Sequence, residues 1–171
     1  GQNTIIKDNI ISGNGSDGIE VDDGNTVMMP FGVQIIGNSI GVDINGDPLG
    51  NDDRGVYIKY AYDNMVGGID PSHANIIANN GFAGIHISFD TTINNTILGN
   101  SVYNNGYLGI DLSSGSGFDY VSNNDVGDTD SGANDFINFP DLTITGFDGT
   151  DISLEYDLDI NDTETSNGYR I

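Results

Sequence analysis

The chain has 171 residues, of which 26 are Asp or Glu and only four are Lys or Arg, so its formal net charge is −22. This balance argues against a nucleic-acid-binding protein, because contacts to phosphate depend on Lys and Arg. It argues equally against docking on an anionic membrane surface. The absence of cysteine excludes a small disulfide-linked scaffold, and no stretch is long and apolar enough to be inserted into a membrane.

The residue usage favours strands and turns over helices. Asp, Asn and Gly are abundant and favour turns, while the aliphatic residues are mostly Ile and Val, which suit strands. We therefore expect almost no helix. The chain begins at Gly1 and enters a strand pattern by Ile5 without a signal peptide, which is typical of a mature product or an excised fragment.

A four-residue motif recurs four times: Gly, an aliphatic residue, any residue, and a second aliphatic residue. Its copies lie at 18–21, 55–58, 84–87 and 109–112. Two aliphatic residues one position apart face the same way, so each copy predicts a short strand. A second motif precedes the copies at 9–11, 38–40, 75–77 and 100–102, in which Asn is followed by Ile or Ser and then by an aliphatic residue. A unit of about 20–30 residues repeated in this way is typical of a solenoid.

The repeats divide the chain into three parts. Residues 1–117 carry four repeats, and 118–141 form an acidic loop or linker in which the rhythm stops. Residues 142–171 contain alternating strand patterns separated by Asp148-Gly149, a sequence that fits a hairpin turn. This β-strand extension is expected to cap the last coil or to begin a β-sandwich.

The links between equivalent strands are longer than hairpin turns, so these strands should run parallel. With no helices to form crossovers, the chain can return only through further short strands. The sequence therefore predicts an all-β fold, a parallel β-helix of about five coils. Aliphatic residues would line its interior, and Asn side chains would stack as hydrogen-bonded ladders at the turns.

The stretches 33–58, 94–112 and 123–142 resemble the right-handed parallel β-helix repeats of large bacterial and archaeal cell-surface proteins. The same superfamily contains the pectin-lyase-like enzymes. The segment 124–140 looks like the closing segment of such repeats, which leads into a β-sandwich. The resemblance implies a right-handed helix and a secreted or cell-surface location.

The third positions of the four Gly-containing motifs carry two of the three candidate catalytic residues, Tyr57 and His86, and Lys59 directly follows the second copy at 55–58. If the copies stack in register, Glu20, Tyr57, His86 and Asp111 form one exposed column. Tyr57 or His86 could remove a proton alpha to a uronate carboxylate, and Lys59 could neutralise that carboxylate. The resemblance implies the same face, where pectin-lyase-like lyases and epimerases carry their sites. The alternative is a solvated sheet face without chemistry. Glu20 and Asp111 would lie about 14 Å apart, too far for a glycosidase pair.

Two acidic segments are candidate calcium sites. Asp43, Asn45 and Asp47 follow one another in the pattern that begins an oxygen-ligand calcium loop, although the later bidentate Glu is missing. Asp128 and Asp130 offer further carboxylates in the closing segment. The alternative for both segments is an ordinary Asx-rich turn on a solvated acidic surface.

These observations predict an extracellular, cell-surface β-helix module that is structural, adhesive or filament-forming, non-catalytic and stabilised by cations. Its expected partners are other subunits of a surface assembly or a polysaccharide, and calcium is the only expected cofactor. Two alternatives remain open. The first is a polysaccharide lyase or epimerase acting on an anionic glycan. The second is a carbohydrate-binding module that uses exposed tyrosines as stacking platforms, namely Tyr57, Tyr60, Tyr62, Tyr103 and Tyr107.

Overall fold

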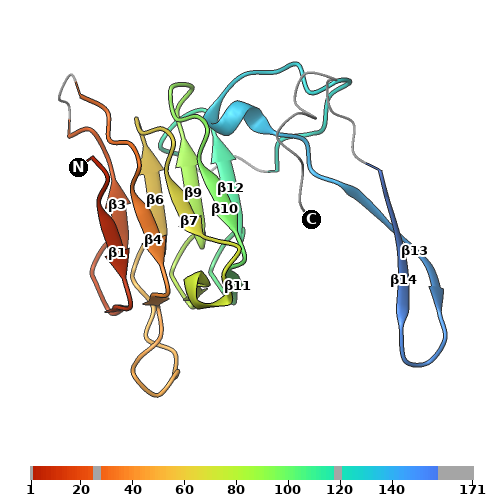
Figure 1. The fold of residues 1–171 in the computed structure, drawn as a ribbon, viewed down its shortest axis with the longest axis horizontal. Helices are drawn as coiled ribbons and strands as arrows, with labels where there is room; N and C mark the ends of the chain where they lie inside the picture. Colours follow the sequence, from red (N-terminus) through yellow and green to blue (C-terminus); the bar gives the residue numbers. More distant parts are fainter. Residues whose placement is uncertain (1, 25–27, 118–120, 158–171) are drawn as a thin grey trace.

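The protein is a parallel β-solenoid of about four turns followed by an antiparallel hairpin, as the computed structural model in Figure 1 shows. The structure describes residues 2–24, 28–117 and 121–157. Within these ranges the only helical segments are two single 3₁₀ turns, η1 (Pro71–His73) and η2 (Ala133–Phe136). None of the described helical segments has the length and apolar character needed to span a bilayer. The predicted all-β fold with almost no helix is confirmed.

Each coil contributes one strand to each of three parallel sheets. The first sheet contains β1 (Ile5–Lys7), β4 (Gln34–Ile36), β7 (Met65–Gly67) and β10 (Thr96–Leu98). The second sheet contains β2 (Ile10–Ile11), β5 (Ser39–Ile40), β8 (Ile76–Ala78) and β11 (Ser101–Tyr103). The third sheet contains β3 (Ile19–Val21), β6 (Val56–Lys59), β9 (Ile85–Ser88) and β12 (Ile110–Ser113).

The aliphatic residues of the repeated motif form the core. Register places Val56 beside Ile85 and Ile85 beside Ile110, so each inward position becomes a column of Ile and Val. Val56 and Ile85 are fully buried, whereas Ile110 in the last coil is exposed. Ile110 belongs to β12, the edge strand of the third sheet, and no further strand of that sheet stacks on it among the described residues.

Asparagine ladders run along the corners of the solenoid, as predicted. One ladder consists of Asn9, Asn38, Asn75 and Asn100. The side-chain amide of each Asn donates to the side-chain oxygen of the next, at distances of 2.8–3.0 Å. A second ladder joins Asn14, Asn51, Asn80 and Asn105 over 2.7–2.9 Å. These bonds satisfy polar groups at the turns that would otherwise be buried without partners.

The solenoid has about four coils rather than the predicted five. One reason is the long link between β5 and β6, the orange loop that projects from the solenoid in Figure 1, which uses residues that a further coil would need. A second reason is that η2 packs against the fourth coil, where a fifth coil would stack. A third pair of asparagines is joined by the amide of Asn64, which donates to the side-chain oxygen of Asn95 at 2.8 Å. Asn134 of η2 continues this line by accepting from the backbone N–H of Asn95 at 2.8 Å, and Ala133 joins the buried core.

The hairpin consists of β13 (Asp141–Phe147) and β14 (Ile152–Asp157) and projects away from the solenoid (Figure 1). The carboxylate of Asp148 accepts from the backbone N–H groups of Thr150 and Asp151, which closes the predicted turn. The remainder of the predicted extension, 158–171, lies outside the described residues.

Candidate functional site

The third sheet aligns the candidate catalytic residues as predicted. Parallel pairing places Glu20 beside Tyr57, Tyr57 beside His86, and His86 beside Asp111. The glycine that opens each motif permits this close stacking. A Cβ atom at Gly55, for example, would lie 2.6 Å from the carbonyl oxygen of Gly84 in the next coil. The alternating pattern therefore brings one side chain from every coil to the outer face of the sheet.

This column is closed, contrary to the expectation that it is exposed. Tyr57 is 3% exposed and His86 is 0% exposed, and Asp111 is buried as well. Only Glu20, in the first coil, remains exposed. Outward residues of a sheet can be buried only if other parts of the chain lie over them. Arg54 and the segment that follows β12 provide part of this cover.

Arg54 connects the column to its surroundings. Its guanidinium carbon lies 4.2 Å from the centre of the Tyr57 ring, and its Nε donates to Nδ1 of His86 at 2.7 Å. A terminal nitrogen donates to the carbonyl oxygen of Ser116 at 3.0 Å, and the other lies 3.6 Å from the carboxylate of Asp17. One cation therefore ties together three coils and the segment after β12.

The hydrogen bonds of His86 assign its tautomer. Arg54 Nε can only donate, so Nδ1 of His86 is assigned as the acceptor, which places the ring proton on Nε2. Nε2 lies 2.6 Å from Oγ of Ser113, and Ser113 in turn donates to the carbonyl oxygen of Gly115 at 2.6 Å. The lone pair that a general base would need is thus already engaged.

Tyr57 is held between its neighbours. Its ring stacks on the imidazole of His86 with the ring centres 4.9 Å apart. Its hydroxyl oxygen accepts from Ser88 at 3.0 Å. Stacked rings and cross-strand hydrogen bonds of this kind stabilise a sheet by tenths of a kcal/mol to about 1 kcal/mol each. The contacts of Tyr57 and His86 are therefore contacts between coils.

Lys59, the third candidate catalytic residue, is paired toward the first coil. Its Nζ lies 2.7 Å from the carboxylate of Glu20 and 3.4 Å from that of Asp22. Partial burial alone would lower the pKa of Lys59, but the hydrogen bond and charge of Glu20, with Asp22, outweigh it and raise that pKa above the usual value. The ammonium also lies 5.1 Å from the centre of the Tyr57 ring. Lys59 thus stays charged, with two carboxylates already beside it.

The first candidate calcium segment forms a turn. One carboxylate oxygen of Asp43 accepts from the backbone N–H of Asn45 at 2.8 Å and from that of Asp47 at 2.9 Å. These backbone hydrogen bonds hold the pKa of Asp43 below its usual value. This geometry is that of an Asx turn, in which the Asp side chain stabilises its own loop.

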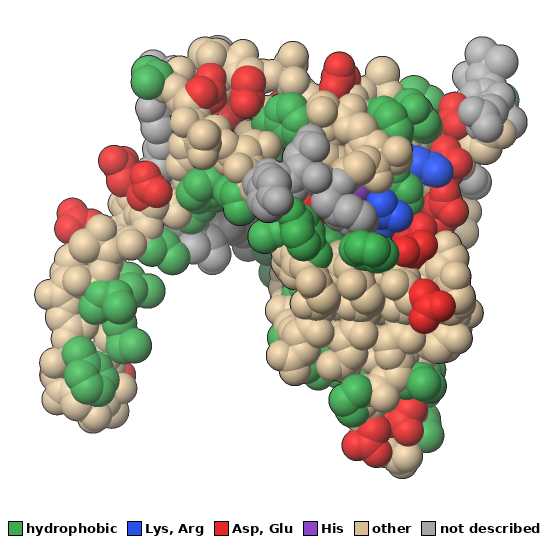
Figure 2. Space-filling view, turned by 180° about the vertical axis from the view of Figure 1, so that it is seen from behind, with side chains coloured by type: hydrophobic (Ala, Val, Ile, Leu, Met, Phe, Trp, Pro, Cys, Tyr) green, Lys and Arg blue, Asp and Glu red, His purple; other side chains and the backbone are tan. Residues whose placement is uncertain are grey.

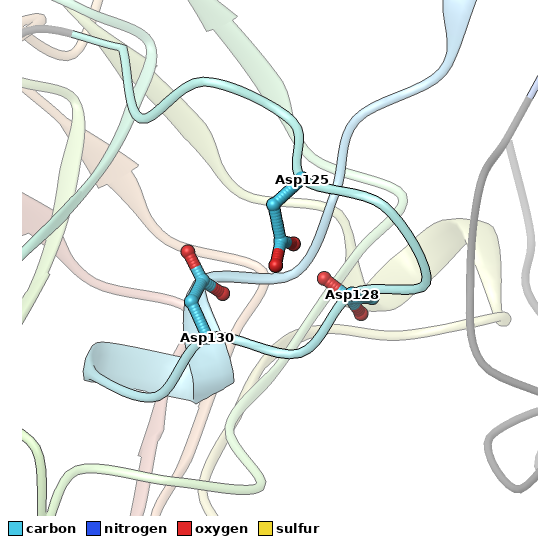
Figure 3. A group of neighbouring side chains, drawn as sticks. All are labelled: Asp125, Asp128 and Asp130. Carbon is cyan, nitrogen blue, oxygen red and sulfur yellow. The ribbon is translucent and has the colours of Figure 1, made fainter.

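The second candidate segment brings three carboxylates together. Asp125, Asp128 and Asp130 each offer an oxygen, and these oxygens lie within 4.8 Å of one another (Figure 3). No other group of three Asp, Glu, His or Cys side chains in the described ranges meets this condition. Hydrogen bonds from Thr129 lower the pKa of Asp125, whereas burial and the neighbouring Asp125 charge raise the pKa of Asp130. The sequence predicted Asp128 and Asp130 but missed Asp125.

Three of the five candidate platform tyrosines already lie against another ring. Tyr57 stacks on His86, Tyr60 on Phe89 at 4.3 Å between ring centres, and Tyr62 on Phe31 at 5.4 Å. Tyr103 is exposed and Tyr107 is half-buried. Most of these rings therefore contribute to packing between coils.

Comparison of the chain with protein-family models, curated proteins and solved structures gave no match. Functional conclusions consequently depend on the geometry of the chain itself.

Proposed function

We propose that this chain is a non-catalytic β-helix module of an extracellular, cell-surface assembly, in which it serves a structural or adhesive role. The observation that carries this proposal is the closed column of the third sheet. The side chains best suited to chemistry, Tyr57 and His86, are buried and join neighbouring coils. A solenoid in which even these side chains connect neighbouring coils suits a spacer or scaffold.

The lyase or epimerase alternative has less support. A polymeric substrate would need access to Tyr57 and His86, which have almost no exposed surface. A general base needs a lone pair within reach of the substrate proton, and Nδ1 of His86 accepts from Arg54 instead. A glycan-binding role would rely chiefly on Tyr103, since the rings of Tyr60 and Tyr62 are stacked on other aromatic residues.

Calcium at the closing segment is part of the proposal. Three carboxylates that converge within 4.8 Å repel one another, and hard oxygen ligands of this kind suit calcium. Calcium would then stabilise the folded state by mass action. We expect calcium to raise the urea midpoint of the protein over that in chelator. Asp130→Asn should abolish this gain, whereas Asp90→Asn, a matched change at an exposed carboxylate, should leave it. An equal gain in both variants would refute the site.

The function is tested by incubating the protein with a panel of anionic polysaccharides, with and without calcium. Ultraviolet absorbance reports unsaturated sugar products of a lyase, and the sugar composition recovered afterwards reports epimerisation. We expect no change in either readout. An absorbance rise or a changed composition that disappears in both His86→Ala and Tyr57→Phe would make the chain an enzyme. Activity unaffected by both variants would point to a contaminant and leave the proposal standing.

A further inference from the structure

The hairpin has one apolar face that no described residue covers. Side chains alternate in direction along β13 and β14, so Leu142 and Ile144 share one side with their cross-strand partners Tyr156 and Leu154. A register shift between Ile144 and Gly146 then brings Phe147 to the same side, opposite Ile152. Each of these six side chains is 56–69% exposed. Figure 2 shows hydrophobic side chains gathered along the hairpin.

The size of this face indicates an interface. At roughly 150–250 Å² for each large side chain, the six residues expose on the order of 700 Å² of apolar surface. Soluble monomers rarely expose contiguous apolar patches larger than a few hundred Å². An isolated two-stranded hairpin is also marginal in water unless its apolar face packs against something. The hairpin therefore needs a partner surface of comparable size.

A second copy of the same face meets this need. Two such faces packed together would bury about 1,400 Å², within the 1,200–2,000 Å² of a standard stable interface. Sheets stack face to face at about 10 Å, so two hairpins would form a small four-stranded sandwich with a two-fold axis. A strand added at the edge of the hairpin would extend the apolar face without covering it. Residues 158–171 carry four large apolar residues, fewer than the six on the face.

The charges of the hairpin favour face-to-face contact over contact through the opposite side. Asp141, Glu155 and Asp157 lie on that opposite side, because they alternate with the apolar residues. Face-to-face packing directs these carboxylates to solvent, whereas packing through the opposite side would bring like charges together. The net charge of −22 still repels two copies at long range, and salt screens this repulsion.

We infer that the apolar face of the hairpin, formed by β13 and β14, is a homodimer interface that binds the same face of a second copy. This inference does not depend on the proposed function, since either an enzyme or a scaffold could dimerise through the hairpin. It predicts association at micromolar concentrations that strengthens as ionic strength rises.

The test is sedimentation equilibrium of the full chain, whose monomer mass is 18.1 kDa, at about 1–100 μM in low and high salt. We expect a mass near two monomers that becomes more complete at high salt. Ile144→Asp places a charge in the interface and should weaken association at least tenfold. Ser153→Asp, the matched control, adds the same charge on the opposite side, across from Gly146, and should change the dissociation constant by no more than about threefold.

A second pair guards against misfolding of the charged variants. Leu154→Ala should weaken association about tenfold, while Ser153→Ala on the opposite side should leave it unchanged. Circular dichroism checks that the solenoid persists in each variant. A wild-type chain that stays monomeric at 100 μM would overturn the inference. Strong binding of a hydrophobic dye would then indicate a different partner, and weak binding would indicate cover by the same chain. Equal weakening by face and control variants would also overturn it.

Discussion

The asparagine ladders predict a stability loss that depends on the position of each rung. Asn75 is fully buried and makes four side-chain hydrogen bonds. Its oxygen accepts from the backbone N–H of Asn38 at 2.9 Å and from the amide of that residue at 3.0 Å. Its amide donates to the carbonyl of Ile35 and to the side-chain oxygen of Asn100, each at 2.8 Å. Asn75→Ala removes all four bonds and leaves the backbone N–H of Asn38 without this acceptor.

The magnitude follows from the number of buried groups that lose a partner. A buried donor or acceptor without a partner costs about 1–3 kcal/mol. Counting one or two such groups after Asn75→Ala, we expect the free energy of unfolding to fall by about 3 kcal/mol. Asn9, the first rung of the same ladder, is exposed and only donates, to Lys7 and Asn38. Water can replace these bonds, so Asn9→Ala should cost no more than about 1 kcal/mol.

Urea unfolding followed by circular dichroism measures both losses, with an unchanged slope confirming that the unfolding transition is the same. Asn9→Ala is the control for Asn75→Ala, since both substitutions remove the same type of side chain from the same ladder. Equal losses for Asn75→Ala and Asn9→Ala, or a loss below about 1 kcal/mol at Asn75, would refute the claim that buried rungs stabilise the coil stack.

Three further predictions concern the close approach of coils, the column and the closing segment. Gly41 and Gly46 have similar φ values, +86° and +85°, but only at Gly41 would a Cβ atom meet the next coil, 1.8 Å from a carbonyl oxygen. In urea unfolding, Gly41→Ala should therefore destabilise the protein by at least about 2 kcal/mol more than Gly46→Ala. Equal losses would contradict the close packing of the coils at Gly41. Nitrogen NMR at neutral pH should find His86 with a proton on Nε2 and none on Nδ1, and a proton on Nδ1 would contradict the Arg54 bond. The lowered pKa of Asp125 adds stability above its ordinary value of 3.8 that is lost as pH falls below that value. Thr129→Val should remove part of this acid-dependent loss in urea midpoints measured between about pH 2 and 5, and an unchanged profile would contradict the assigned cause.

The coil architecture could be predicted because it follows from a repeated pattern. The Gly-aliphatic-x-aliphatic motif encodes a strand, and its recurrence encodes register, so the alignment of Tyr57 with His86 was correct. The ladders were predictable for the same reason, since Asn recurs at the same place in each repeat. The hairpin followed from the alternating strand patterns on either side of Asp148-Gly149, although the register shift between Ile144 and Gly146 was not predicted.

The closed column could not be predicted because its cover does not repeat. Arg54 occurs in one coil only, and its contact with Ser116 joins residues 62 positions apart in the chain. Strand periodicity identifies which side chains point outward but cannot show what lies over them. The sequence nevertheless contained one indication of a contact between Arg54 and the column, since Arg54 is one of only four basic residues and directly precedes a repeated motif. Asp125 was missed because its convergence with Asp128 depends on the loop conformation rather than on spacing alone.

A double-mutant cycle between Arg54 and His86 tests the central claim most directly, that the column binds coils to one another. Urea unfolding would be measured for Arg54→Met, His86→Phe and the double variant, with a Lys59→Met and His86→Phe cycle as control. The bond from Nε to Nδ1 predicts a coupling of about 1–3 kcal/mol for the first pair. The control should be nearly additive, because no hydrogen bond or ion pair between Lys59 and His86 is found among the described residues. A coupling below about 0.5 kcal/mol between Arg54 and His86 would mean that the column does not hold the coils together and would contradict the account.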